Sequence, residues 1–116
     1  MNRVNGKTVA ELIYRCGSAL TLRSGGQSIR YWAILQPVTS KSWQNMERMI
    51  PNVGEIPRGQ YLYIGPIART LNSGDTIDFD GRHFVVRRAD RVYFQNEALF
   101  VWGLCVEGGG DDPWTT

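Results

Sequence analysis

The sequence predicts a mainly β protein: a small β-barrel or rolled antiparallel sheet of about six strands with a short N-terminal helix and a long loop (38–59). Runs rich in β-branched and aromatic residues recur along the chain, and turn residues such as Gly, Asn and Asp separate them. Residues 74–107 hold three such runs in succession, which is the pattern of a three-stranded meander.

The chain has 116 residues, which suits one domain. We expect a single β-barrel domain over residues 1–107, followed by a flexible glycine- and aspartate-rich tail over 108–116. The net charge of +2 argues against a protein that binds nucleic acid mainly by electrostatics. Eleven arginines stand against two lysines, a bias that suits protein contacts. We also expect no signal peptide and no membrane span, and hence a soluble, cytosolic chain.

The N-terminal helix is predicted from a capping box, in which Thr8 precedes Glu11 by three residues. The helix should start there, run for about two turns and stop at Gly17 in a left-handed conformation. One apolar stripe falls on its predicted buried side: Val9, Leu12, Ile13 and Cys16.

Six segments have strand character. They cover residues 19–23, 29–36, 60–65, 76–79, 83–94 and 98–106. Asp80-Gly81 supplies the positive φ angles of a tight hairpin, whereas residues 95–97 indicate a slightly longer turn. The segments 29–36 and 98–106 are apolar on both faces. A sheet with one wet face would alternate apolar and polar residues, so the last strand is expected to be covered twice, the second time by a helix or another subunit.

The long loop over 38–59 contains two prolines and two glycines and lacks strand periodicity. Loops of this length are usually functional or disordered. A turn or two of helix starting at Ser42 would place Trp43, Met46 and Ile50 on one sparse apolar side. That side either folds back on the barrel or belongs to a partner, and the residues alone leave both alternatives open.

No catalytic, metal or cofactor motif stands out, so we expect a protein that is not an enzyme and needs no cofactor or metal. The only histidine, His83, has no nucleophile or ligand motif around it. The aspartates near Gly81 match a calcium loop poorly and suit turns better. Cys16 and Cys105 are expected to be buried thiols rather than a disulfide.

Four arginines cluster in the predicted strand 83–94 and just before it: Arg82, Arg87, Arg88 and Arg91. With nearby aromatic residues, such a face can bind single-stranded nucleic acid by stacking and phosphate contact. The alternative, which we favour, is that these arginines are solvated or pair across strands with Asp78, Asp80 and Asp90. A third interpretation, in which these arginines contact another protein, is favoured more than nucleic-acid binding and less than the solvated or self-paired arrangement.

Two stretches carry a family resemblance: Gly-Asp-Thr-Ile-Asp-Phe-Asp-Gly-Arg-His-Phe-Val-Val at 74–86 and Phe-Val-Trp-Gly-Leu-Cys-Val-Glu at 100–107. Together with the order of helix, strands and long loop, they resemble the small head-closure or head-tail connector proteins of tailed bacteriophages and prophages. The resemblance covers roughly residues 9–107.

The resemblance implies a non-enzymatic virion structural protein, assembled in the host bacterial cytoplasm as a homo-oligomeric ring in the phage neck. Its partners would be copies of itself, the portal with its adaptor, and the tail, with DNA in the channel. In that family a long loop reaches toward the channel and can help retain packaged DNA. The equivalent contacts here would come from Trp43, Met46, Arg48 and Ile50. A tail completion or terminator protein and a small-barrel single-stranded nucleic-acid-binding protein are the alternatives.

Overall fold

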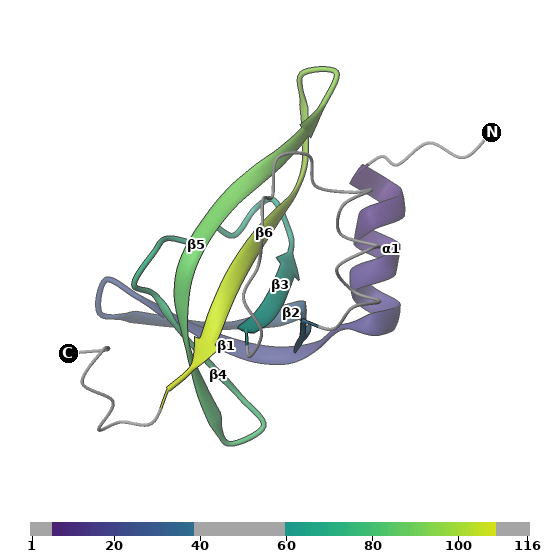
Figure 1. The fold of residues 1–116 in the computed structure, drawn as a ribbon. Helices are drawn as coiled ribbons and strands as arrows, with labels where there is room; N and C mark the ends of the chain where they lie inside the picture. Colours follow the sequence, from purple (N-terminus) through teal and green to yellow (C-terminus); the bar gives the residue numbers. More distant parts are fainter. Residues whose placement is uncertain (1–5, 39–59, 109–116) are drawn as a thin grey trace.

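A computed structural model of the chain describes residues 6–38 and 60–108. These residues form a closed antiparallel barrel with one helix outside it, which confirms the predicted fold class (Figure 1). The elements are α1 (Gly6–Cys16), β1 (Ser18–Ser24), β2 (Gln27–Pro37), β3 (Gln60–Gly65), β4 (Thr76–Phe79), β5 (Arg82–Phe94) and β6 (Glu97–Glu107). Around the barrel the strand order is β1-β2-β3-β6-β5-β4, and pairing of β1 with β4 closes it.

Three tight hairpins set the register of the sheet. Their central residues, at 25–26, 80–81 and 95–96, all have positive φ angles. This geometry matches the right-handed twist of the strands that it joins. Asp80-Gly81 therefore makes the predicted turn, whereas the turn after β5 is shorter than predicted because Glu97 is already the first residue of β6.

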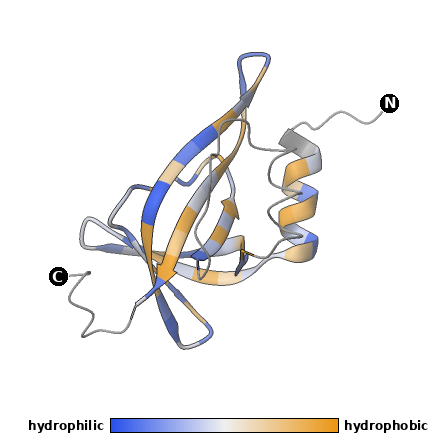
Figure 2. Cartoon of the chain, viewed as in Figure 1, coloured by the Kyte–Doolittle hydropathy of each residue, from blue (hydrophilic) through white to orange (hydrophobic). Residues whose placement is uncertain are grey.

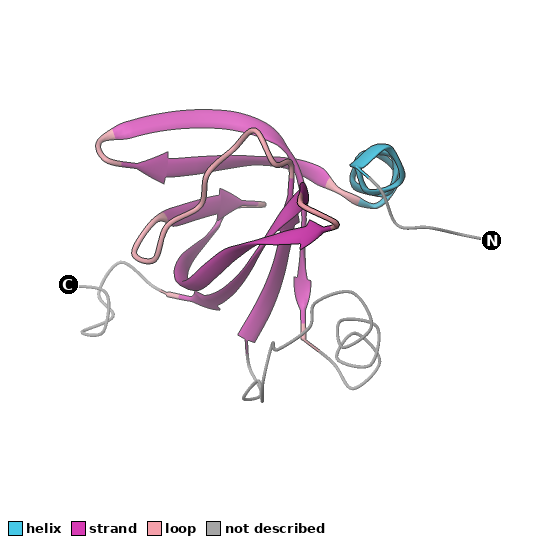
Figure 3. Ribbon diagram, turned by 90° about the horizontal axis from the view of Figure 1, so that it is seen from above, coloured by secondary structure: helices cyan, strands magenta, loops and turns pink. Residues whose placement is uncertain are grey.

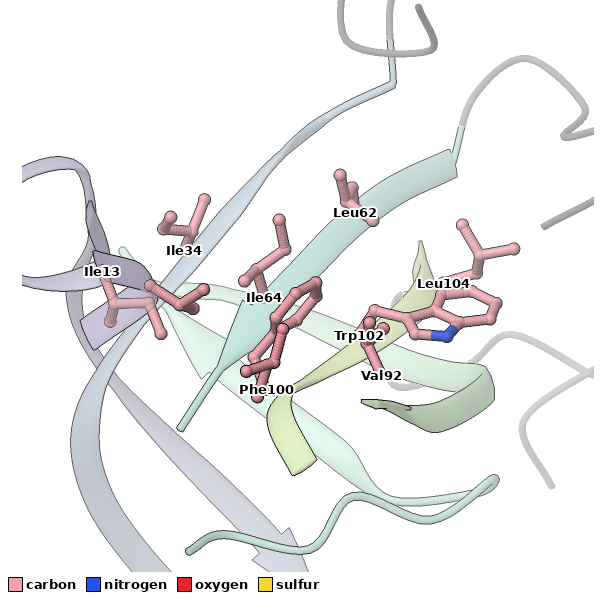
Figure 4. Packing of buried hydrophobic residues seen from close by; sticks show 10 residues of the cluster. Ile13, Ile34, Leu62, Ile64, Val92, Phe100, Trp102 and Leu104 are labelled. Carbon is pink, nitrogen blue, oxygen red and sulfur yellow. The ribbon is translucent and has the colours of Figure 1, made fainter. Parts of the chain in front are cut away.

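Two hydrophobic clusters stabilise the barrel, one inside it and one on its outer wall. The inner cluster draws residues from all the described strands: Leu20, Leu22, Ala33, Tyr63, Leu71, Ile77, Phe84, Val86, Val101 and Cys105. The outer cluster includes α1 residues: Val9, Ile13, Ile34, Leu62, Ile64, Val92, Leu99, Phe100, Trp102 and Leu104 (Figure 4). Alternation separates the two sets on β3, where Leu62 and Ile64 face outward and Tyr63 inward, whereas on β5 the register irregularities change which positions face the barrel interior.

The strand β6 is buried on both faces from Leu99 to Cys105, as the sequence predicts. Helix α1 packs against β2 and β6 on the outer wall (Figure 3). The sequence predicted that a helix or another subunit covers the second face of β6, and α1 of the same chain covers it. Along β2 the cover is less complete, because Trp32 stays 46% exposed.

Helix α1 differs from its prediction at both ends. It begins at Gly6, so Thr8 lies inside the helix and is not its N-cap, and it spans 11 residues instead of two turns. Gly17 lacks a positive φ angle. Glycine is needed at this position for another reason. A Cβ atom would collide with backbone carbonyl groups and would lie 2.7 Å from the carbonyl oxygen of Ala33. Gly17 therefore allows the helix end to approach β2 closely.

The buried side of α1 is also narrower than predicted. Val9 and Ile13 are buried, but Leu12 is 39% exposed and Cys16 is exposed. The row of Val9, Ile13 and Gly17, four residues apart, faces the barrel, and the neighbouring row of Leu12 and Cys16 is left at the surface. The expectation of two buried thiols is thus wrong for Cys16 and confirmed for Cys105.

One polar pair lies within the inner core. The hydroxyl oxygens of Tyr31 and Tyr63 are 2.7 Å apart and satisfy each other. Burial raises the pKa of both phenols and raises the pKa of the Cys105 thiol to about 12, so all three stay neutral at physiological pH. Gly65 belongs to the same arrangement, because a Cβ there would collide with the Tyr63 ring.

Candidate interaction surface

An apolar groove of about 370 Å³ lies between α1, the loop after β3 and the start of β6. Its lining residues are Val9, Ala10, Ile13, Pro66, Ile67, Ala68, Ala98 and Leu99. None of them carries a polar side chain. The helix covers only part of the outer wall, so the groove lies between the side of α1 that carries Ala10 and the start of β6.

Two exposed tyrosines flank the groove. Tyr14, 78% exposed, lies four residues after Ala10 and so continues the same row of α1. Tyr93, 56% exposed, is paired in register with Ala98. The groove and the tyrosines beside it thus form one apolar and aromatic surface.

Two further aromatic side chains are exposed nearby. The indole Nε1 of Trp32 donates a hydrogen bond to the carbonyl oxygen of Tyr14 at 3.1 Å, which holds this indole against the helix end. Phe94, 45% exposed, sits beside the turn of the β5–β6 hairpin, which projects beyond the rest of the barrel in Figure 1. Exposed aromatic residues are enriched at protein interfaces.

The four arginines predicted as a cluster are not brought together. Arg82 and Arg91 are nine positions apart on β5, which corresponds to about 30 Å along a strand. Arg88 pairs with Leu104 and shares the outer wall with it, whereas Arg91 pairs with Val101 of the inner cluster and lies on the opposite face. Arg87 falls in a register irregularity between them. Figure 2 shows hydrophilic residues along the middle of β5 beside the hydrophobic β6.

Arg82 is held by the chain itself. Its Nε donates to Oε2 of Glu107 at 2.8 Å, and its Nη2 donates to Oε1 of Glu107 and to the Tyr61 hydroxyl. The guanidinium also lies over the rings of Tyr61 and Phe84, 5.4 Å from each centroid. The hydrogen bond to Glu107 raises the pKa of Arg82, and the same bond lowers the pKa of Glu107. Arg82 is therefore paired within the chain, but with Glu107 and not with one of the predicted aspartates.

Asp78 joins a second charged group, with different partners from those predicted. Its Oδ2 accepts a hydrogen bond from Arg23 Nε at 2.5 Å, and its Oδ1 lies 2.5 Å from His83 Nδ1. Partial burial alone would raise the pKa of Asp78, but the hydrogen bonds from His83 and Arg23 outweigh it and lower the pKa. The predicted pairing of Asp90 is also different, because its Oδ1 accepts from the Arg91 backbone nitrogen at 2.8 Å.

The other three arginines of the predicted cluster, Arg87, Arg88 and Arg91, are exposed. The Arg88 guanidinium lies 5.5 Å from the centre of the Trp102 ring, a cation–π contact on the outer wall. Arg87 and Arg91 make no ion pair with a carboxylate within residues 6–38 and 60–108. These two side chains therefore stay available for an external partner.

The predicted loop contacts Trp43, Met46, Arg48 and Ile50 lie outside the described residues. The two ends of their segment are held together, because Val38 N donates to the Gln60 carbonyl at 2.8 Å. The chain after Glu107 is described only as far as Gly108, which donates to the His83 carbonyl at 3.0 Å.

Within the described part of the chain, no three His, Cys, Asp or Glu residues are grouped closely enough to hold a metal ion. The described helix is too short to cross a membrane.

Local sequence patterns do not predict the groove or the exposed tyrosines. The groove depends on how α1 sits against β6, which no local pattern encodes. A signal existed at the hairpin tip: Tyr93 and Phe94 are adjacent and so point to opposite faces, and next to a turn there is little chain to cover both.

Comparisons with protein-family models, curated proteins and solved structures find no match for this chain. The structure defines its class as a small closed β-barrel with an external helix.

Proposed function

We propose that the protein is a virion structural protein, a subunit of a head-tail connector or head-completion stopper ring in the neck of a tailed bacteriophage. The observation that carries the proposal is the apolar and aromatic surface that a closed, internally packed barrel leaves uncovered. The family resemblance of residues 74–86 and 100–107 supports the placement in the neck.

The area that such a role requires is a modest share of the chain's exposed surface. A standard interface buries about 800 Å² on each partner. The chain exposes 7729 Å² in total, so one such interface takes about a tenth of its surface. A ring subunit needs two of these, one for each neighbour. In this proposal the groove with Tyr14 and Tyr93 lies within one interface, and the projecting hairpin tip or the chain beyond Gly108 contributes to the other.

In this proposal the ring joins the portal and adaptor to the tail, and the segment 38–59 faces the channel and helps to retain packaged DNA. The test is the mass of the protein in solution, measured by sedimentation velocity alone and with purified portal, adaptor or tail components. We expect discrete oligomers or co-sedimentation with a neck component. A chain that stays monomeric at all concentrations and joins none of these components contradicts the proposal.

A tail completion or terminator protein is a second candidate in the same particle. It would use the same exposed surface and differ only in which ring it contacts. Co-sedimentation with the tail tube alone, with no binding to portal or adaptor, would favour it.

Binding of single-stranded nucleic acid is a third candidate, favoured by exposed Arg87 and Arg91 on the strand β5 that also carries exposed Tyr93 and Phe94. Its signature is an affinity for an oligonucleotide that falls steeply with salt concentration. Replacing Arg87 and Arg91 with Ala should then remove the binding, whereas Arg82→Ala serves as the matched control because Arg82 is already paired with Glu107.

A further inference from the structure

The groove beside α1 has the chemistry of a site for an apolar or proline-containing peptide segment. It is lined only by apolar side chains and flanked by Tyr14 and Tyr93. Aromatic-lined grooves bind proline-containing segments well, because such segments lose little conformational freedom on binding. The charged residues next to its lining in the sequence, Glu11, Arg69 and Glu97, carry both signs, and the lining itself is apolar, so apolar fit is the main basis of selection.

The chain itself contains a matching segment. Beyond the described Gly108 it reads Gly-Gly-Asp-Asp-Pro-Trp-Thr-Thr, in which Trp114 is the only large apolar side chain. Pro113 fixes one backbone angle next to it. Tryptophan is enriched among residues that dominate binding energy, and a groove of about 370 Å³ can accept one indole ring with its neighbour.

To enter its own groove, Trp114 would have to reach back along nearly the whole length of β6. The groove touches β6 at Leu99, and the chain leaves the barrel at Gly108, nine residues later at the other end of the strand (Figure 1). Nine strand residues span about 30 Å. The six residues from Gly108 to Trp114 reach at most about 21 Å when fully extended. A neighbouring copy can therefore fill the groove with less extension of the tail than the same chain can.

We propose that the segment around Pro113 and Trp114 of one copy docks in the groove of the next copy, so that subunits join head to tail. This contact joins two different surfaces, and such contacts generate rings when the rotation between subunits closes. The inference rests on the proposed ring function and names the contact that would build the ring.

Peptide binding tests the contact directly. The receptor is the full-length chain carrying Trp114→Ala, whose own tail cannot compete. The probe is a fluorescein-labelled peptide with the sequence of residues 108–116, followed by fluorescence anisotropy. We expect saturable binding with a Kd on the order of 10–100 µM. The same peptide with Ala in place of Trp should bind at least tenfold more weakly.

A groove variant and a matched control locate the site. Ala10→Arg fills the groove from an exposed position of α1, and Leu12→Arg adds the same side chain on the other flank of the helix. Added to the receptor, Ala10→Arg should abolish peptide binding and Leu12→Arg should leave it within about twofold. Circular dichroism confirms that both variants fold. Equal binding by both variants, or by both peptides, overturns the proposal.

Sedimentation velocity of mixtures tests the head-to-tail arrangement. Trp114→Ala and Ala10→Arg should each abolish assembly of the full-length chain. An equimolar mixture restores one intact contact and should therefore form dimers and nothing larger. Assembly that both single variants retain overturns this contact but leaves the ring proposal standing on another surface. A wild-type chain that stays monomeric while its free tail blocks peptide binding shows docking within one chain, and also overturns the contact.

Discussion

The packing of α1 on the barrel can be tested with two adjacent residues that differ in burial. Ile13 is 6% exposed and Leu12 is 39% exposed. Replacing either with Ala removes the same three carbons, which are worth about 2.4 kcal/mol when fully buried. At Ile13 the cavity adds to this loss, so we expect about 3 kcal/mol of destabilisation. At Leu12 the atoms are partly in water and the site is open, so about 1 kcal/mol is expected.

Urea denaturation measures the difference between the two variants. With a slope of about 2 kcal/mol per molar, a gap of about 2 kcal/mol shifts the midpoint of Ile13→Ala about 1 M below that of Leu12→Ala. Equal midpoints would refute the assignment of Val9 and Ile13 as the row that faces the barrel. In that case the groove beside the helix would also be misplaced.

Three further predictions follow from the same structure. The folded pKa of Asp78 is lowered, so its contribution to stability is present above the unfolded pKa near ~3.9 and is lost as the pH falls through the folded value. Asp78→Asn should therefore flatten the loss of melting temperature between neutral pH and pH 3, and an unchanged slope would contradict the pairing with His83. Mass spectrometry after treatment with a maleimide at pH 7 should show one modified thiol, Cys16; rapid labelling of Cys105 in the folded protein would contradict its burial. Gly17→Ala should lower the free energy of unfolding by about 1–3 kcal/mol, because the added Cβ meets backbone on both sides; no loss would show that the helix end can move away freely.

The sequence predicts the strands well because local chemistry defines them. Asp80-Gly81 supports the positive φ angles of its hairpin, and Pro37 closes β2. The two apolar faces of residues 98–106 correctly indicate a strand covered twice. In each case the deciding residues lie within a few positions of the feature that they determine.

The parts that the sequence does not predict depend on distant residues. The pairing of β3 between β2 and β6, and of β4 with β1, joins segments that no local pattern relates. The prediction that Cys16 is buried was wrong because the rotation and position of α1 on the barrel decide which of two adjacent rows of side chains is covered. The predicted arginine cluster does not form, because side chains alternate between the two faces of a strand and the strand is long. Positions that are close in sequence are therefore spread over two faces and about 30 Å.

Imaging of phage particles assembled without this protein tests the central claim most directly. The proposed ring predicts heads that package DNA and then lose it, or filled heads beside unattached tails, with the neck layer missing. Complete particles with an intact neck and retained DNA would contradict it.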